Sequence, residues 1–157
     1  MYEAGIVYRK PLEGDREQLA NLILRFYRFN EEFDPAWALA GDADNRALSL
    51  ADRYIAGEGY TIVADHEGEL TGFIHAYVQE YPLLENSKQA VIVELYVKPQ
   101  YRGRGIATGL LEKLMEAVSS DGISVVTAMF PTANFVAERF YSKRKFRRYL
   151  QIYLREV

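Results

Sequence analysis

The segment KPQYRGRGIATGLL, residues 98–111, places two glycines and two arginines where an apolar strand pattern changes to an apolar helix pattern. A helix N-terminus attracts anions, because its first N–H groups lack partners within the helix and the helix dipole is positive there. Gly103 and Gly105 would let an anion approach the backbone, and Arg102 and Arg104 would add positive charge. A basic, solvated turn would have the same composition, so this segment alone leaves both interpretations open.

Two common phosphate-binding motifs do not fit this segment. The P-loop requires Lys-Ser/Thr directly after its second glycine, and no lysine follows Gly105 or Gly109. The dinucleotide fingerprint G-x-G-x-x-G would require glycine at the position of Thr108. The sequence therefore favours neither ATP nor NAD as the ligand.

Length and composition predict one globular domain over residues 1–157, of which 49% are hydrophobic. The net charge of −3 argues against a general nucleic-acid binder. The absence of cysteine excludes disulfides and thiolate metal sites, and two separated histidines make no metal site. No run reaches the roughly 18 apolar residues of a membrane span, and the N-terminus lacks a secretory signal pattern. We therefore expect a cytoplasmic protein without a metal and without a membrane or nucleic-acid partner.

Hydrophobic periodicity predicts the order β-α-α-β-β-β-α-β-α-β, without an internal repeat. The expected strands are 6–11, 60–65, 69–80, 90–97, 123–130 and 146–157, and the expected helices are 15–30, 46–56, 105–120 and 132–145. The residues His-Glu-Gly between the second and third strands are typical of a hairpin turn. This order predicts an α/β fold with a mixed sheet, in which a central β-α-β unit carries residues 98–111.

Two sequence signatures resemble those of the GNAT superfamily of acyl-CoA-dependent N-acetyltransferases. Residues 100–105, Gln-Tyr-Arg-Gly-Arg-Gly, resemble the loop that binds the CoA pyrophosphate. Farther along the chain, Asn134, Ala137, Phe140-Tyr141 and Phe146 resemble the second signature. The predicted element order is similar to that fold, with its splayed central sheet, over nearly all 157 residues.

One position departs from the second signature. The family usually has glycine immediately before the phenylalanine, and this chain has Lys145. Glycine at a helix C-terminus accommodates a left-handed conformation. We therefore expect Lys145 either to adopt that strained conformation or to end the helix differently.

The resemblance implies acetyl-CoA as the acyl-donor cosubstrate. Backbone groups of Leu95 and Val97 would pair with the pantetheine arm in the gap between the splayed strands, and Asn134 would lie at the pantetheine end. The residues expected at the pyrophosphate are Arg102, Gly103, Arg104, Gly105, Ile106, Ala107 and Thr108.

Tyr141 is the general acid and the sulfur contact that the resemblance implies. Attack of an amine on a thioester expels a thiolate, which a phenol can protonate. Asn134 lies seven residues earlier, so both residues would share one helix face about 10 Å apart. A half-buried aromatic residue beside Phe140 would have the same spacing.

Glu94 is the candidate base, acting directly or through water. Strand alternation predicts that Ile92, Glu94 and Tyr96 share one face. A carboxylate in a central strand is costly to bury without a partner, which indicates a role. A salt-bridged or partly exposed glutamate is the alternative.

Residues 31–45 and their surroundings are the expected acceptor side. This segment carries five acidic residues and no lysine or arginine, and Tyr27 and Phe33 are among its aromatic neighbours. Acids with aromatic rings suit a cationic amine, although a solvated acidic loop over core aromatics has the same composition. His75 would line the amine pocket or assist as a base, and a structural histidine is the alternative.

The function indicated is acetyl transfer from acetyl-CoA to a primary amine by direct attack in a ternary complex. A small cationic amine and a peptide acceptor, either a protein N-terminus or a lysine, remain open. A non-catalytic acyl-CoA sensor is the competing class, but such a sensor would need neither Glu94 nor Tyr141. The resemblance also implies a homodimer, often formed in this family through the C-terminal strands.

Overall fold

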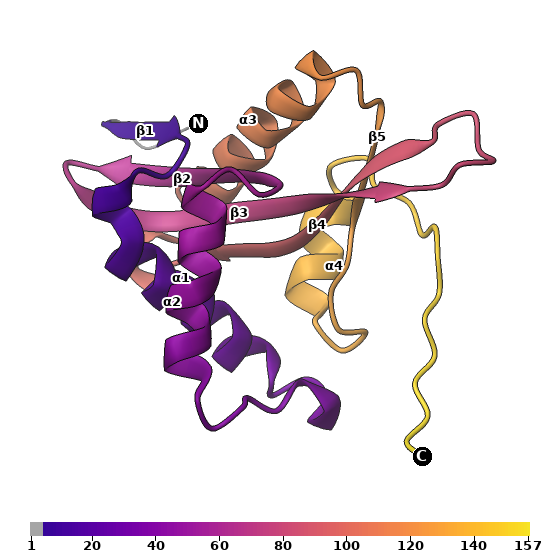
Figure 1. Ribbon diagram of the computed structural model, residues 1–157, viewed down its shortest axis with the longest axis horizontal. Coiled ribbons are helices and arrows are strands. Elements are labelled where there is room, and N and C mark those ends of the chain that lie inside the picture. Colours follow the sequence, from indigo (N-terminus) through magenta and orange to yellow (C-terminus); the bar gives the residue numbers. More distant parts are fainter. Residues whose placement is uncertain (1–4) are drawn as a thin grey trace.

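The computed structural model describes residues 5–157 and shows one five-stranded mixed sheet with helices on both faces (Figure 1). The strand order is β1-β2-β3-β4-β5, antiparallel except for the parallel β4–β5 pair. The strands are β1 (Ile6–Arg9), β2 (Tyr60–His66), β3 (Glu69–Glu80), β4 (Lys88–Val97) and β5 (Val125–Ala128). The helices are α1 (Arg16–Asn30), α2 (Ala43–Ile55), α3 (Ile106–Ser120) and α4 (Phe135–Ser142). The predicted α/β fold with a mixed sheet is confirmed.

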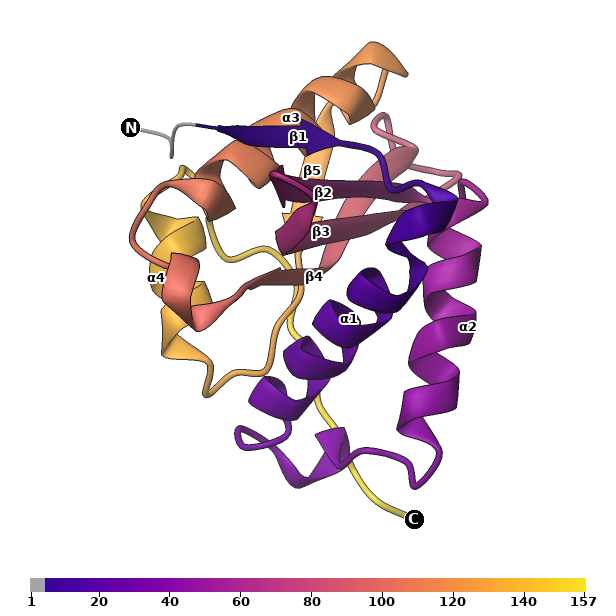
Figure 2. The same cartoon turned by 90° about the vertical axis from the view of Figure 1, so that its left-hand side faces the viewer.

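Two hydrophobic clusters lie on opposite faces of the sheet. Figure 2 shows α1 and α2 on one face and α3 on the other. Helices α1 and α2 pack on one face, where Phe73 and Tyr96 point toward them. Helix α3 packs on the other face over Ile74 and Ile92, together with Tyr141 of α4. Because both faces are covered, the central strands read as nearly continuous apolar runs in the sequence.

The predicted hairpin is formed by β2 and β3 with a two-residue turn. Glu67 and Gly68 both have positive φ, 52° and 92°, as a type I′ turn requires. The turn sets the pairing of His66 with Glu69 and, with one bulge, that of Thr61 with His75. The conformation of this turn therefore fixes the position of His75 on β3 relative to Thr61 on β2.

The strand predicted over residues 146–157 is not formed. This segment is extended but pairs with no other strand, and it runs away from the sheet beyond α4 (Figure 1). Its apolar residues are exposed, Leu150 at 63%, Ile152 at 78% and Leu154 at 67%. Alternating apolar residues meet only the side-chain requirement for a strand, namely one face that can be buried. The backbone also needs a partner, and no other described strand of this chain pairs with the segment.

Lys145, three residues after the end of α4 at Ser142, adopts a left-handed conformation, with φ of 69°. The N–H groups of Arg144 and Phe146 both donate to the Tyr141 carbonyl, at 2.9 and 3.2 Å. The first of the two possibilities stated for Lys145 therefore holds, and the missing glycine leaves backbone strain behind Tyr141.

Replacing Lys145 with glycine is expected to raise the free energy of unfolding by about 1 kcal/mol, because glycine adopts positive φ without a Cβ penalty. Urea denaturation followed by circular dichroism measures this change. The matched control is Lys143→Gly, two residues earlier in a right-handed conformation with φ of −68°, where glycine brings no relief. A Lys145→Gly variant no more stable than the parent would contradict the assigned strain.

Among residues 5–157, no helix is both long enough and apolar enough to cross a lipid bilayer.

Candidate active site

The N-terminal end of α3 presents backbone N–H groups that have no partner inside the helix. Gly105 precedes the helix with φ of 79°, and Gly103 has φ of 78°. The Gly109 N–H donates to the Gly105 carbonyl at 3.0 Å, and no side chain caps this end. The N–H groups of the first turn therefore point outward, as an anion requires. This geometry fits the pyrophosphate of CoA.

The two arginines of this loop contact different neighbours. Arg102 Nε donates to the Val97 carbonyl at 2.9 Å, and its guanidinium lies 5.4 Å from the ring centre of Tyr96. The Arg104 guanidinium lies 5.5 Å from the ring centre of Tyr101. Arg102 thus ties the loop to β4.

Replacing Gly103 with valine is expected to raise the dissociation constant for CoA at least about tenfold, or 1.4 kcal/mol. A branched side chain resists positive φ, and a Cβ on Gly103 would project into open space beside the first turn of α3. Isothermal titration calorimetry with CoA measures the change.

The matched control is Gly122→Val at the opposite end of α3. Gly122 also has positive φ, 81°, and open space around its Cβ position. It carries the same strain away from the loop, so its CoA affinity should stay close to that of the parent. Equal affinity loss in both variants would assign the effect to strain rather than to the anion site.

Arg144, just after α4, brings positive charge to the first turn of α3. Its Nη2 and Nε donate to the Thr108 hydroxyl at 2.6 and 3.2 Å. Its Nη1 donates to the Phe140 carbonyl at 2.9 Å, and its guanidinium lies over the Phe140 ring at 3.8 Å. The contact with Thr108 depends on the packing of α4 beside α3, which no local spacing reveals.

Strands β4 and β5 separate partway along β4. Their pairing begins at Gln89 with Val125 and ends at Ile92 with Ala128. One further hydrogen bond, from the Met129 N–H to the Ile92 carbonyl at 2.9 Å, closes this ladder. Leu95 and Val97 lie beyond the last β5 pair and pair only with β3. Their strand edge therefore faces the gap in which the pantetheine arm is expected.

A β-bulge at Val93 changes which residues of β4 share a face. His75 pairs with Glu94, whereas the next residue, Ala76, pairs with Ile92. Ile92 consequently lies in the α3 cluster, on the face opposite Glu94 and Tyr96. The predicted common face of Ile92, Glu94 and Tyr96 was therefore wrong for Ile92, because the bulge interrupts the two-residue period. It keeps an apolar side chain under α3 and turns the carboxylate toward α1 and α2.

Glu94 is buried, with 1% of its surface exposed. The Tyr54 hydroxyl donates a short hydrogen bond to Oε1, and Oε2 is buried without a hydrogen-bond partner of normal geometry. Burial raises the pKa of Glu94, and the hydroxyls of Tyr54 and Tyr27 partly offset that rise. A carboxylate held by one oxygen, with the other oxygen unpaired and a raised pKa, is suited to accept a proton.

Tyr54 was not identified from the sequence, although it is the side chain that holds Glu94. It lies in α2, forty residues earlier in the chain, and its ring stacks on His75 at 3.6 Å between ring centres. Nothing in the local pattern of α2 distinguishes Tyr54 from an ordinary core residue. Tyr54 and Glu94 come together only because the folded chain places α2 beside β4.

His75 is buried behind Tyr54, and its role in the amine pocket or as a base stays a prediction. Its Nδ1 lies 2.8 Å from the Thr61 hydroxyl, and burial lowers its pKa to about 4. The imidazole is therefore neutral at physiological pH. His75 supports the Tyr54 ring, which agrees with the structural alternative stated for it.

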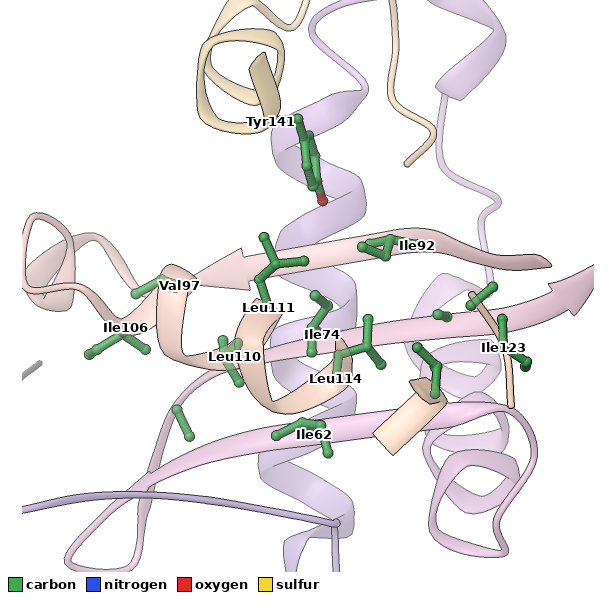
Figure 3. Close-up of a cluster of buried hydrophobic side chains, with 14 residues drawn as sticks. Ile62, Ile74, Ile92, Val97, Ile106, Leu110, Leu111, Leu114, Ile123 and Tyr141 are labelled. Carbon is green, nitrogen blue, oxygen red and sulfur yellow. The ribbon is translucent and has the colours of Figure 1, made fainter. Parts of the chain in front are cut away.

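Tyr141 descends from α4 with its hydroxyl directed toward β4 (Figure 3). Its ring stacks on Phe130 with 5.6 Å between ring centres, and Phe140 and Phe146 contact it edge-on. Burial raises the pKa of Tyr141, so the phenol stays protonated at neutral pH. A protonated phenol fixed by aromatic packing can donate its proton to a thiolate. Tyr141 and Glu94 lie on opposite faces of the sheet.

Asn134 caps α4 and joins it to α1. Its Oδ1 accepts from the Ala137 N–H at 3.0 Å, and its Nδ2 donates to Asn30 Oδ1 at 2.9 Å. Asn30 in turn donates to the Phe26 carbonyl. The side chain of Asn134 thus fixes the helix that carries Tyr141, and contact with pantetheine remains a prediction.

Four of the five acidic residues of segment 31–45 contact groups of the loop or of α1 and α2. Glu31 accepts from the Leu39 N–H at 3.1 Å, and Asp34 accepts from the Ala36 N–H at 2.9 Å. Asp42 pairs with Arg46 at 2.7 Å, and Asp44 lies 3.8 Å from Arg28. These carboxylates order the loop and the start of α2.

The predicted acceptor aromatics lie beneath this loop. Tyr27 stacks on Trp37, with 5.7 Å between ring centres, and Phe33 meets Phe29 edge-on at 5.3 Å. Tyr27 also interacts with Glu94, and burial, followed by that carboxylate, raises the Tyr27 pKa. Tyr27 therefore belongs both to the acceptor side and to the surroundings of the candidate base.

The sequence profile of the Acetyltransferase (GNAT) family matches residues 16–146 of the chain. The chain belongs to this family. The match includes the α3 loop, Glu94 and Tyr141, and it ends at Phe146, four residues after α4 ends at Ser142.

Relatives and solved structures agree with this assignment. An uncharacterised N-acetyltransferase of Archaeoglobus fulgidus is 29% identical over 140 residues, covering 89% of this chain and 92% of that protein. A GCN5-related N-acetyltransferase from Ralstonia eutropha has the same fold, with a TM-score of 0.77, 22% identity and coverage of 97% and 99%. An aminoglycoside N-acetyltransferase in complex with CoA has a TM-score of 0.76, 15% identity and coverage of 97% and 94%. The chain is similar to each of them, and the two structures share its fold.

Proposed function

We propose that this acetyltransferase transfers an acetyl group from acetyl-CoA to the primary amine of a small molecule by direct attack in a ternary complex. The observation that carries the proposal is the site geometry. The α3 N-terminus has no side-chain cap, and β4 is free of β5 beyond Ile92. The buried Glu94 carboxylate lies on one face of β4, and the protonated Tyr141 phenol packs on the other face. The CoA bound to the similar aminoglycoside enzyme supports the choice of donor.

Each residue has a distinct part in this reaction. The N–H groups of the first turn of α3 bind the pyrophosphate, and the free edge of β4 at Leu95 and Val97 aligns the pantetheine arm. The acceptor arrives as its ammonium cation and loses a proton to Glu94, directly or through water, because only the neutral amine is nucleophilic. The amine nitrogen forms a bond to the acetyl carbonyl carbon, and the carbon–sulfur bond breaks. Tyr141 protonates the departing thiolate, and the second proton that the acylated nitrogen loses returns to the Tyr141 phenolate, directly or through water.

The test is an acetylation assay in which free CoA is followed with purified protein and a panel of amines. The panel contains monoamines, polyamines, amino acids, an aminoglycoside, and peptides with a free N-terminus or lysine. Turnover with at least one small amine, and N-acetylated product by mass spectrometry, is the expected result. Tight CoA binding without turnover in any class would favour an acyl-CoA sensor, and turnover confined to peptides would favour a protein acetyltransferase.

We also propose that two copies associate through residues 147–157. The exposed apolar side chains of this segment would be covered, and its backbone groups would gain partners, if it packed against a second copy beside the edge strand β5. Light scattering coupled to size exclusion is expected to give twice the chain mass. Removal of residues 148–157 should give a folded monomer, and a monomeric full chain would contradict the proposal.

A further inference from the structure

An apolar pocket of about 420 Å³ lies between the two N-terminal helices and the loop that joins them. Its walls come from α1, from residues 36–40 and from the first half of α2. The lining is Ile23, Leu24, Tyr27, Ala36, Trp37, Ala38, Leu39, Ala40, Ala43, Arg46, Ala47 and Leu50. Its volume is in the range of roughly 300–1,000 Å³ that small-molecule sites occupy.

Small residues create this space, and the wall offers little charge. Five alanines line the pocket together with Trp37 and Leu50. Arg46, the one charged residue of the lining, pairs with Asp42 at 2.7 Å. None of the acidic residues of segment 31–45 belongs to the lining. A polycation would therefore find no carboxylate along this wall, whereas an alkyl or aryl group would be removed from water.

Tyr27 connects the pocket to the candidate base. Its ring lines the pocket and stacks on Trp37, and it interacts with Glu94. Glu94 is 1% exposed, and its Oε2 has no hydrogen-bond partner of normal geometry. A buried unpaired carboxylate oxygen is costly, and a substrate N–H donor would satisfy it. An ammonium group at Oε2 would place the body of the same molecule beside Tyr27.

We infer that the acceptor is a primary monoamine with an apolar body, an alkyl or arylalkyl amine, which the pocket between α1 and α2 holds while its nitrogen meets Glu94. This inference rests on the proposed function for the transfer step. The binding of the apolar body is a separate property, which can be measured without turnover.

A homologous series of amines tests the inference. For butylamine, pentylamine and hexylamine, kcat/KM is expected to rise about fourfold per CH2 group, as burial of each group at about 0.8 kcal/mol implies. Hexylamine and 1,6-diaminohexane form a matched pair of equal length. The monoamine should be the better substrate by at least about tenfold, because the diamine places a second ammonium in an apolar pocket.

A pocket variant localises the effect. Ala43→Leu narrows the pocket and is expected to remove most of the gain from butylamine to hexylamine, while the KM for acetyl-CoA stays unchanged. Ala117→Leu, also on a half-buried helical alanine but in α3, is the control and should keep the gain. A flat amine series, a preference for the diamine or an unchanged Ala43→Leu variant would each overturn the inference, while turnover itself would still support the proposed function.

Trp37 gives a readout that does not depend on catalysis. It is the only tryptophan of the chain and lines the pocket, so its fluorescence should change saturably with hexylamine and not with 1,6-diaminohexane at equal concentration. Saturable binding without turnover would uphold the pocket and contradict the proposed reaction. Absence of any fluorescence change, with or without turnover, would overturn the pocket assignment.

Discussion

Replacing Tyr141 with phenylalanine is expected to lower kcat about 100-fold, at the lower end of the range for loss of a general acid. The substitution removes one hydroxyl and keeps the ring that stacks on Phe130. The fold and the pyrophosphate contacts at α3 should therefore persist. Steady-state assays of CoA release, together with titration of CoA, separate the chemical step from binding.

The pH dependence of the Tyr141→Phe variant adds a second measurement. Burial raises the pKa of Tyr141, so the phenol is protonated throughout the neutral range. The activity of the parent enzyme should therefore decline only under alkaline conditions, where the phenol loses its proton. That alkaline limb should be lost in the variant. Phe140→Leu, a change to the neighbouring aromatic, is the control and should keep the limb. A Tyr141→Phe enzyme with unchanged kcat would show that the thiolate is protonated by another group or by water.

Replacing Glu94 with glutamine is expected to lower kcat/KM at least about 100-fold, because the amide cannot take a proton from the ammonium. In the parent enzyme, activity should rise with pH as Glu94 ionises. Since burial raises the pKa of Glu94, this rise lies above the pH at which an exposed glutamate titrates. The variant should lose the part of the rise that belongs to Glu94. His75, with its pKa lowered to about 4, would place any rise of its own at acidic pH.

The same variant should be more stable than the parent at alkaline pH. A carboxyl with a raised pKa in the folded protein binds its proton more tightly there than in the unfolded chain. Stability is therefore full below the unfolded value and falls as pH rises toward the folded value. Glutamine has no proton to lose and keeps an oxygen for the Tyr54 hydroxyl. Lower activity with higher stability above neutral pH would identify Glu94 as a functional residue, whereas lower stability would indicate a purely structural one.

Much of the fold could be predicted, because local patterns determine it. The hairpin glycine at 68, the glycines that precede α3 and the apolar stripe of α3 each act within a few residues. Element order follows from such signals. The start of α2 was set three residues late, at Arg46 rather than Ala43, because Ala-Asp-Asn reads as loop until Asp42 is seen to pair with Arg46.

The parts of the site that were missed depend on contacts between distant segments. Tyr54 meets Glu94 across forty residues, and Arg144 meets Thr108 across thirty-six. The bulge at Val93 places Ile92 on the opposite face of the sheet, and no glycine or proline in the sequence indicates this bulge. Strand register, helix packing and the unpaired C-terminal segment result from tertiary contacts, which periodicity does not encode.

The central claim is that the α3 N-terminus binds the donor while Glu94 and Tyr141 carry the proton transfers. It is tested most directly by measuring CoA affinity and amine acetylation on the same preparations of the parent, Glu94→Gln and Tyr141→Phe proteins. We predict that the three dissociation constants for CoA agree within about threefold, since each substitution leaves the α3 loop intact, while turnover falls at least about 100-fold in both variants. Turnover equal to that of the parent in either variant, or a loss of CoA affinity large enough to explain the loss of turnover, would contradict it.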